Sequence, residues 1–206
     1  MVDNGLAGVV LAAGESRRMG QPKQLLPFGE HTILERVVDT LLTAGVGEVI
    51  VVLGHLAERV GAVLGDRPVR TVINASYRQG MLSSVKCGVR AIDASYDAAL
   101  FALGDQPHID CAVVSEVIRA YRAGSAGIVI PWYGGKKGHP IIINLQRYRE
   151  AIVNLPDDAG LNVLMQEHAD DVHLIDAATE DIIRDIDVPD DYTRELARFT
   201  ERRSSI

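Results

Sequence analysis

The sequence of 206 residues is poor in several residue types, and each shortage excludes a class of protein. Phe, Trp and Tyr together make up 5% of the chain, too few for a platform on which nucleic-acid bases stack. The formal net charge is −7 and no segment forms a long basic stripe, so general nucleic-acid binding is not expected. No apolar run approaches the roughly 20 residues of a membrane-spanning helix.

Cysteine is equally scarce. Cys87 and Cys111 are the only two, and their spacing fits neither a metal site nor a redox pair, which predicts buried thiols rather than a disulfide. The apolar segment near the N-terminus has no basic region before it, so we expect no signal peptide and a cytoplasmic protein. An acidic protein that acts on an anionic substrate needs a local cationic loop, a metal ion, or both.

Hydrophobic residues at 47% and charged residues at 24% are typical of a globular protein. We expect one domain spanning residues 1–206, with only residues 201–206 as a loose tail. Short apolar runs and amphipathic stretches alternate, which predicts a doubly wound α/β fold with a mostly parallel sheet and the ligand at the carboxyl ends of its strands. The expected strands are Val9–Ala13, Glu48–Leu53, Val69–Ile73, Ala98–Leu103 and Gly127–Pro131, and the expected helices cover 32–44, 55–64, 81–92 and 110–123. Thr32 followed by Glu35 is a capping-box pattern at the start of the first helix, and Asp110 is expected to cap the last of these.

The last third of the chain departs from this alternation. Residues 132–140 are rich in Gly and Lys and precede Ile141-Ile142-Ile143, which predicts a hairpin. A loop is expected at 156–160, before a helix. We further predict short strands at Val172–Ile175 and Ile183–Ile186, and a helix from Pro189 towards Phe199.

The most informative segment is residues 11–23, Leu-Ala-Ala-Gly-Glu-Ser-Arg-Arg-Met-Gly-Gln-Pro-Lys, directly after a buried strand. Gly14 and Gly20 let backbone N–H groups approach oxyanions, while Arg17, Arg18 and Lys23 add positive charge. The spacing is neither that of a P-loop nor Gly-x-Gly-x-x-Gly. An ordinary basic surface turn is the alternative, but the coincidence of strand, glycines and cations favours a site for a polyphosphate.

Two carboxylates follow other expected strands. Asp105 ends the fourth strand and is suited to Mg²⁺, which binds through one or two carboxylates plus substrate phosphates; a turn-forming or capping Asp is the alternative. In Asp185-Ile186-Asp187 the alternation of a strand points both carboxylates to the same side. Capping the helix at Pro189 and binding metal are equally compatible with Asp187.

The sequence also contains weaker polar motifs. Ser83 and Ser84, after Asn74, suit either an anion or nucleotide at a helix start or an ordinary Ser-capped helix. His139 lies in a flexible basic turn and is suited to orienting an acceptor or contacting phosphate, although a lone loop histidine is more often structural. The remaining histidines show no metal spacing and are expected to be structural: His31, His55, His108, His168 and His173.

Five motifs occur in order along about residues 8–192: Leu11-Ala12-Ala13-Gly14 with Arg18-Met19-Gly20 and Pro22-Lys23, then Gly80-Met81 with Ser84, Gly104-Asp105-Gln106-Pro107, Gly138-His139-Pro140 and Asp185-Ile186-Asp187. Together they resemble the MobA-like nucleotidyltransferases, most closely the molybdenum cofactor cytidylyltransferases. The resemblance implies a Rossmann-like three-layer α/β/α fold. It also implies transfer of CMP from CTP to the phosphate of a molybdopterin-type cofactor, with release of pyrophosphate and Mg²⁺ (or Mn²⁺) as cofactor.

The resemblance also implies roles for residues. Arg18, Lys23 and Asp105 would be catalytic, Asp105 and Asp187 would hold the metal, and Ala12-Ala13 accompanies cytosine preference in the family. The nucleotide would contact Leu11, Ala12, Ala13, Gly14, Arg18, Gly20, Lys23, Asn74, Gly80, Ser84 and Gly104. The acceptor would contact Gln106, Pro107, Gly138 and His139.

The sequence departs from the family at Leu82, where a serine is common, and at Arg17, where the residue is often small. Leu82 removes a hydroxyl on the acceptor side, so the acceptor is less defined than the nucleotide. Three alternatives stay open: nucleotidyl transfer to another phosphorylated acceptor, a non-catalytic cofactor carrier or chaperone, and a nicotinamide-dependent reductase on the same scaffold. We expect a monomer or weak homo-oligomer that binds small molecules and hands its product to a molybdenum hydroxylase.

Overall fold

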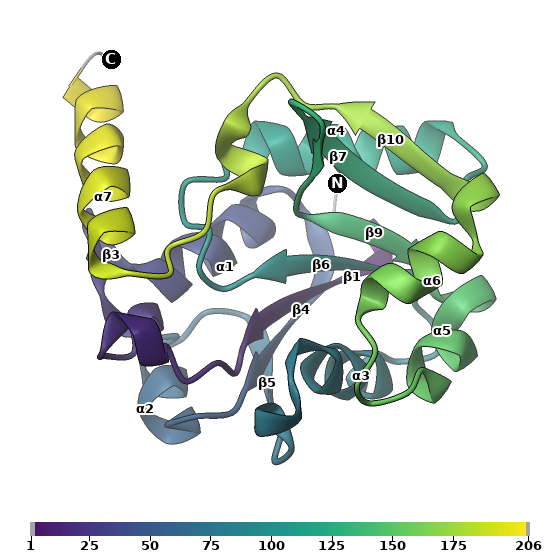
Figure 1. Ribbon diagram of the computed structural model, residues 1–206, viewed down its shortest axis with the longest axis horizontal. Coiled ribbons are helices and arrows are strands. Elements are labelled where there is room, and N and C mark those ends of the chain that lie inside the picture. The colour runs from purple at the N-terminus through teal and green to yellow at the C-terminus, as the bar shows by residue number, and fades with distance from the viewer. Residues whose placement is uncertain (1–2, 205–206) are drawn as a thin grey trace.

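The computed structural model describes residues 3–204 and is built around one eight-stranded sheet (Figure 1). The strands follow the order β10-β7-β9-β6-β1-β4-β5, with the short β8 paired to β7. A separate two-stranded sheet joins β2 and β3. The strands are β1 (Asp3–Ala12), β2 (Pro27–Phe28), β3 (His31–Thr32), β4 (Val46–Leu53), β5 (Val69–Ile73), β6 (Ala98–Leu103), β7 (Ile128–Tyr133), β8 (Lys136–Lys137), β9 (Ile141–Asn144) and β10 (Val172–Asp176).

The order of the strands reverses at β1. From β1 the chain moves outward through β4 and β5 on one side, and then returns to place β6 on the other side of β1. Both β4 and β6 pair with β1 in parallel. The carboxyl ends of β1 and β6 therefore lie side by side at the point of reversal, which is the usual ligand position in an open α/β sheet.

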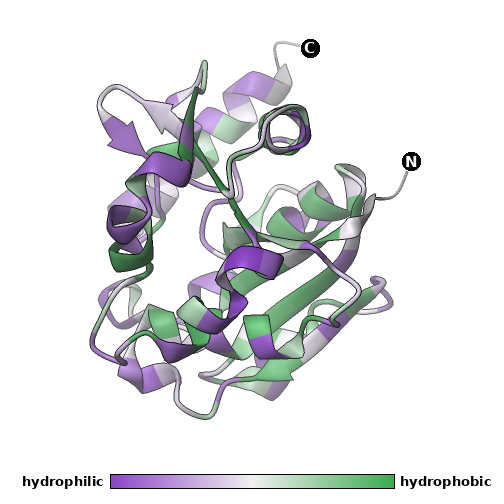
Figure 2. Cartoon of the chain, turned by 90° about the vertical axis from the view of Figure 1, so that its right-hand side faces the viewer, coloured by the Kyte–Doolittle hydropathy of each residue, from purple (hydrophilic) through white to green (hydrophobic). Residues whose placement is uncertain are grey.

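Helices cover both faces of the sheet. One core cluster joins the sheet to α1, α2 and α4, and the other joins it to α3, α5 and α6. This is the predicted three-layer α/β/α fold with a mostly parallel sheet, and Figure 2 shows apolar strands enclosed by helices of mixed polarity. The helices are α1 (Ile33–Thr43), α2 (Ala57–Ala62), α3 (Met81–Ala91), α4 (Cys111–Ala123), α5 (Leu145–Asn154), α6 (Leu161–Glu167) and α7 (Pro189–Ser204).

Local signals set the helix boundaries as expected. Thr32 and Glu35 form a reciprocal capping box that begins α1. The side chain of Asp110 accepts a hydrogen bond from the backbone N–H of Val113 and begins α4. Cys87 and Cys111 are free thiols, as predicted, but both are half-buried and not fully buried. Within residues 3–204 no helix is long and apolar enough to cross a membrane.

The segment after β7 forms the predicted hairpin and then inserts a strand against the parallel order. Lys136 and Lys137 pair antiparallel with Tyr133 and Trp132. β9 then lies between β6 and β7, antiparallel to both. Its three isoleucines are almost fully buried, so the hairpin 132–140 is anchored to the centre of the sheet.

Two predictions near the C-terminus are wrong. Residues 183–186 form no strand; a 3₁₀ turn, Glu180–Ile183, is followed by extended chain. The backbone of this segment bonds to loops instead of a strand edge, because Ile186 N–H donates to the carbonyl of Asp105 and Ile182 carbonyl accepts from His139 N–H. The expected tail is helical through Ser204, since α7 continues beyond Phe199; residues 205–206 lie outside the described chain.

The helix α7 lies at one side of the molecule, away from the two faces of the sheet (Figure 1). It packs on a third, smaller apolar cluster in which Phe28 and Ile186 are fully buried. The rings of Phe28 and Phe199 lie 4.8 Å apart. This contact holds the segment 184–188 against the loop that follows β1.

Candidate active site

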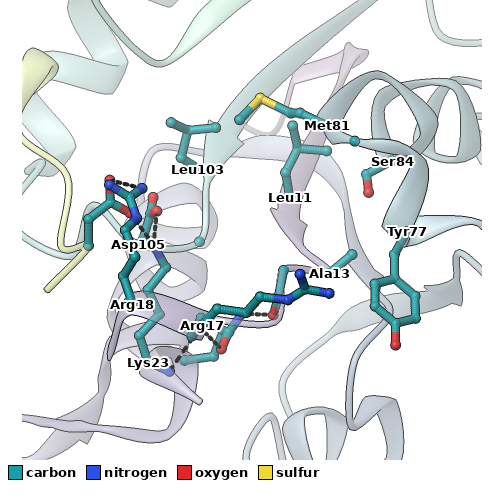
Figure 3. Close-up of a pocket in the computed structure, with 16 residues that line it drawn as sticks. Leu11, Ala13, Arg17, Arg18, Lys23, Tyr77, Met81, Ser84, Leu103 and Asp105 are labelled. Atoms are coloured by element: carbon teal, nitrogen blue, oxygen red, sulfur yellow. Dashed lines mark hydrogen bonds and ion pairs between the residues drawn. The ribbon is translucent and has the colours of Figure 1, made fainter. Parts of the chain in front are cut away.

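A cavity of about 380 Å³ opens where β1 and β6 end. Its wall comes from the loop after β1, the loop after β6, the start of α3 and Asp187 (Figure 3). Lys23 and Arg18 extend towards Asp105 at one end, and Tyr77 and Ser84 lie at the other. The point where the strand order reverses, here called the switch point, therefore brings together four segments that are far apart in the sequence.

The loop after β1 is held in shape by its own polar groups. Gln24 is almost fully buried, and its side-chain amide donates to the carbonyl oxygens of Ala12 and Gly14. Ser16 adopts a left-handed backbone with φ of 54°, and its hydroxyl accepts the backbone N–H of Lys23. These bonds turn the chain so that Lys23 returns to the mouth of the sheet.

The ammonium group of Lys23 is the centre of a charged cluster. Its Nζ lies 2.5 Å from Asp105 Oδ2, 3.0 Å from Asp187 Oδ1 and 2.8 Å from the carbonyl oxygen of Ile186. Arg18 Nη2 lies 2.9 Å from the other carboxylate oxygen of Asp187. Thus residues expected to bind phosphate and residues expected to bind metal meet at one point.

Burial alone would lower the pKa of Lys23, but the charges of Asp105 and Asp187 outweigh it and raise the pKa above its ordinary value. A third carboxylate lies nearby. Burial, together with the negative charge of Asp105, raises the pKa of Asp185. Asp185 Oδ1 accepts a hydrogen bond from Gln106 Nε2 at 2.7 Å. The cluster therefore holds three carboxyl groups but only two cationic side chains.

The donor atoms fit a divalent cation of the Mg²⁺ type. Asp105 Oδ1 is buried without a hydrogen-bond partner in the described part of the chain, while Asp105 Oδ2 and Asp187 Oδ1 already converge on one cationic nitrogen. Hard oxygen ligands of this kind suit Mg²⁺ or Mn²⁺. Residues 3–204 contain no group of three or more His, Cys, Asp or Glu side chains that could hold a metal ion by themselves.

Asp187 does not cap α7, which resolves the alternative left by its sequence position. The carboxylate of Asp191 accepts the backbone N–H groups of Asp187 and Val188 instead. The Asp187 side chain faces Lys23 and Arg18.

The opposite end of the cavity is formed by the start of α3. Gly80 and Ser84 line it together with Tyr77. Ser83 does not cap the helix, since its hydroxyl bonds to the carbonyls of Gly80 and Ser76. Asn74 lies behind the wall, where its amide donates to both serine hydroxyls.

Gly104 permits the close approach of β6 to β1 at the floor of the cavity. A Cβ there would lie 3.0 Å from the carbonyl oxygen of Leu11 and 3.1 Å from the Cβ of Ala12. To accommodate a side chain here, the neighbouring atoms would have to shift by a few tenths of an ångström.

A second cavity, of about 410 Å³, adjoins the first and shares Leu11 and Met81 with it. Its lining is mainly apolar, with contributions from α3, the sheet and α6: Leu82, Val85, Phe101, Ile130, Ile141, Leu161 and Met165. Gly138 and His139 close one side. A Cβ on Gly138 would collide with the backbone of Ile182, so this glycine is required by packing.

His139 lines the second cavity as a neutral group. Removal from water lowers its pKa to about 4, so the imidazole carries no charge near pH 7. His139 lines the second cavity and not the first.

The structure brings most of the predicted nucleotide residues to the first cavity: Leu11, Ala13, Gly14, Arg18, Lys23, Gly80, Ser84 and Gly104. Both predicted metal ligands, Asp105 and Asp187, line it as well. Three other predicted nucleotide residues do not line it. Ala12 is buried in the core beneath it, Gly20 ends a 3₁₀ turn, and Asn74 lies behind α3. The predicted acceptor residues Gln106 and Pro107 line neither this cavity nor the second; Gln106 is buried and bonds to Asp185.

Several lining residues were missed by reasoning from sequence. Ser16, Gln24 and Tyr77 line the first cavity, and most of the second cavity was not anticipated. The available signal for Gln24 is its position directly after the glycine-rich segment 11–23. The apolar residues carry no such signal, because a side chain lining a cavity and one buried in the core share the same pattern.

A switch-point cavity with a cationic loop and paired carboxylates defines this protein as a nucleotidyltransferase. More particularly, the chain belongs to the MobA-like NTP transferase family, whose domain pattern matches residues 8–172.

Two curated relatives span nearly the whole chain. It is 32% identical to nicotine blue oxidoreductase from Paenarthrobacter nicotinovorans, with 93% of this chain and 96% of the relative covered. It is 29% identical to molybdenum cofactor cytidylyltransferase from Escherichia coli K12, with coverage of 94% and 96%. It also resembles the crystal structure of Rv0371c in complex with manganese from Mycobacterium tuberculosis H37Rv, at 26% identity, coverage of 94% and 98%, and a TM-score of 0.76.

Proposed function

We propose that this protein transfers CMP from CTP to the phosphate group of a molybdopterin-type cofactor and releases pyrophosphate. The observation that carries the proposal is the meeting of Lys23, Arg18, Asp105 and Asp187 at one end of the first cavity. An apolar cavity directly beside it provides room for the organic part of an acceptor. The similarity to a molybdenum cofactor cytidylyltransferase supports the choice of substrates.

In the proposed reaction, an oxygen of the acceptor phosphate attacks the α-phosphorus of the nucleotide. The new P–O bond forms as the bond to the β-phosphate oxygen breaks, and its electron pair leaves with pyrophosphate. Positioning and neutralisation of charge supply most of the catalysis in such transfers. Lys23 and Arg18 stabilise the negative charge that grows on the leaving group.

Asp105 and Asp187 would hold a divalent cation, which when bound supplies a Lewis acid for the phosphate oxygens. The carboxylates are well placed for this role because they approach from separate loops and face the same nitrogen of Lys23. The resemblance to a protein solved with manganese supports a divalent ion.

The acceptor needs no strong general base, because a phosphate nucleophile is already anionic at neutral pH. The neutral side chain of His139 agrees with this, since it lines the second cavity without adding charge. We propose that His139 and Gly138 contact the acceptor, and that Ala13 and Leu11 lie beside the base of CTP. Delivery of the product to a molybdenum hydroxylase remains part of the proposal.

A second function is favoured by one observation. The relative named nicotine blue oxidoreductase is as similar to this chain as the cytidylyltransferase is, over the same length. A nicotinamide-dependent reductase would use the same two cavities for the nucleotide and an organic substrate. Against it, the loop after β1 lacks Gly-x-Gly-x-x-Gly.

The deciding experiment measures pyrophosphate release by the purified protein with Mg²⁺, comparing CTP, GTP and ATP, with and without molybdenum cofactor. Release with CTP that requires the cofactor is the expected result. Nucleotide binding without release would point to a carrier, and release with a sugar phosphate alone would reassign the acceptor. In parallel, oxidation of NADH or NADPH with nicotine blue would favour the reductase.

A further inference from the structure

The amino group of Lys23 contacts three oxygen atoms at once, two from carboxylates and one from the backbone. Asp105 Oδ2, Asp187 Oδ1 and the Ile186 carbonyl lie between 2.5 and 3.0 Å from its Nζ. The side chain of Lys23 is only 12% exposed, so water does not loosen this arrangement. A cationic nitrogen thus occupies the point on which the cation-binding oxygens converge.

The two possible occupants exclude each other. A divalent cation coordinated by Asp105 Oδ2 and Asp187 Oδ1 needs the space that the Lys23 ammonium fills, and two cations so close together would repel strongly in a partly buried site. Of the four carboxylate oxygens of Asp105 and Asp187, three bond to Lys23 or Arg18. Within residues 3–204, Asp105 Oδ1 is the one left without a partner. One free oxygen is a weak ligand set for Mg²⁺, which keeps its waters unless several anionic ligands are offered.

A triphosphate changes this competition, because it offers Lys23 another anionic partner in the same cavity. Lys23 lies in the loop that lines the cavity, and its long side chain can move from carboxylates to phosphates without a change of backbone. The released carboxylates and the phosphate oxygens together then provide the ligands that the free site lacks.

We propose that Lys23 acts as an internal substitute for the divalent cation and makes metal binding dependent on the nucleotide. In this arrangement the free protein binds Mg²⁺ or Mn²⁺ weakly, and the nucleotide and the metal strengthen each other's binding. The inference rests on the proposed function only in taking a nucleoside triphosphate as the group that draws Lys23 away. It assigns Lys23 a positioning role in addition to its contact with phosphate.

The test is a titration with Mn²⁺, followed by the paramagnetic resonance signal of the free ion, of the protein without nucleotide. We expect Lys23→Met, which keeps an unbranched side chain but removes the charge, to bind Mn²⁺ at least tenfold more tightly than wild type. Arg17→Met is the matched control: it removes one positive charge from the same loop, but Arg17 pairs with Glu15 and not with the two carboxylates. It should change the affinity less than threefold, and Asp105→Asn should weaken Mn²⁺ binding in the Lys23→Met background.

The same titration with CTP measures the coupling. CTP should increase the Mn²⁺ affinity of wild type at least tenfold, and of Lys23→Met by a clearly smaller factor. If Lys23→Met binds Mn²⁺ no better than Arg17→Met in the absence of nucleotide, the inference is overturned. If CTP does not bind at all, the proposed function fails, while the comparison without nucleotide still decides whether Lys23 blocks the ion.

A measurement on wild type removes any dependence on the folding of the variants. The nitrogen resonance of the Lys23 ammonium, assigned by its loss in Lys23→Arg, should shift on addition of CTP without metal. Mg²⁺ alone at the same concentration should leave it in place. A shift with Mg²⁺ alone equal to that with CTP would contradict the inference.

Discussion

The two adjoining cavities have similar volumes, about 380 and 410 Å³, but opposite chemistry. The first is organised by Lys23, Arg18, Asp105 and Asp187, which form a network of ion pairs. The second is walled by aliphatic and aromatic side chains, with a neutral histidine at one side. Charge thus defines the place of the phosphates, whereas shape and apolar contact define the place of the other substrate.

The difference teaches why one substrate is easier to infer than the other. Oxyanions require cations and close backbone N–H groups, and few residue types at few positions meet that need. An apolar cavity can be built by many combinations of side chains and therefore leaves no short signature. Leu11 and Met81, which belong to both cavities, mark where one kind of chemistry gives way to the other.

The largest expected effect comes from breaking the charged cavity at Asp105. Asp105→Asn keeps the shape of the side chain but removes a ligand of the divalent cation and a partner of Lys23. We expect the rate of pyrophosphate release to fall about 100- to 1,000-fold, the scale seen when one element of transition-state stabilisation is lost. Steady-state kinetics with CTP and molybdenum cofactor measures it.

Asp66→Asn serves as the control for Asp105→Asn, since Asp66 is exposed in the turn before β5 and lines neither cavity. It should leave the rate unchanged. A loss of only a fewfold in Asp105→Asn would mean that this carboxylate is not needed for the reaction. The charged cavity would then have a role other than catalysis.

Most of the fold could be predicted from sequence because its signals are local. β5 and β6 have the predicted boundaries, and α1 begins at its predicted capping box. The segment 183–186 alternates like a strand but has no sheet edge to join, because β7, next to it in space, already pairs with β9 and β10. A pattern of alternation reports extended chain, and only the tertiary structure decides whether that chain finds a partner.

The site residues likewise fall into those that the sequence places correctly and those whose direction depends on the loop. Lys23, Arg18 and Asp105 follow strand ends or lie within a dense motif, so sequence places them in the first cavity. Gln106 follows Asp105 directly, yet its side chain faces inward and bonds to Asp185. Sequence neighbours after a strand end point in different directions, which only the path of the loop determines.

The second largest expected effect is a loss of stability at low pH. It concerns His108, which contacts the segment that carries Asp187 into the charged cavity. His108 is buried in the loop after Asp105, and its Nε2 lies 3.1 Å from the carbonyl oxygen of Asp181, in the segment that leads to Asp187. Burial, reinforced by the positive charge of Arg184, lowers the pKa of His108 from 6.5 to about 4. The folded protein therefore resists protonation that the unfolded chain accepts.

The sign follows from this difference. Between pH 6.5 and about 4 the unfolded state binds more protons, so stability is complete above that window and is lost as the pH falls through it. The loss amounts to about 3 kcal/mol of unfolding free energy for one such histidine. His108 also faces Glu195, with Nδ1 3.8 Å from Oε2, and its pKa is lowered to about 4 in the presence of that carboxylate. Urea unfolding of wild type and His108→Gln at pH 7 and pH 4.5 measures it, and an equal decrease in both proteins would exclude His108 as the cause.

A smaller effect separates the apolar cavity from the charged one. Leu161→Trp introduces a large ring from α6 into the second cavity. The ring would take up part of the volume that the proposed acceptor needs, and steric misfit in a binding pocket changes affinity by about 1–3 kcal/mol. The KM for the acceptor should therefore rise about 10-fold or more, while the affinity for CTP is unchanged. Leu174→Trp, on β10 at a position 40% exposed and lining neither cavity, is the control. An equal loss of CTP affinity in Leu161→Trp would show that the two cavities do not bind separate substrates.

The smallest effect distinguishes two neighbouring arginines of the first cavity, both of which line it and are similarly exposed, at 71% for Arg18 and 78% for Arg17. Arg17 bonds to Glu15, which Arg78 also contacts, so its side chain is held by Glu15 and not by the carboxylates of the charged cluster. Arg18 instead donates a hydrogen bond to Asp187, beside Lys23, where the phosphates would contact it.

A charged hydrogen bond is worth about 1.5–3 kcal/mol, and the exposure of Arg18 places its contribution at the lower limit. Calorimetric titration with CTP should therefore show about a 10-fold weaker Kd for Arg18→Ala and a change below about threefold for Arg17→Ala. Equal effects would mean that the loop attracts the nucleotide through its total charge, and that the position of Arg18 on Asp187 is of no consequence for binding.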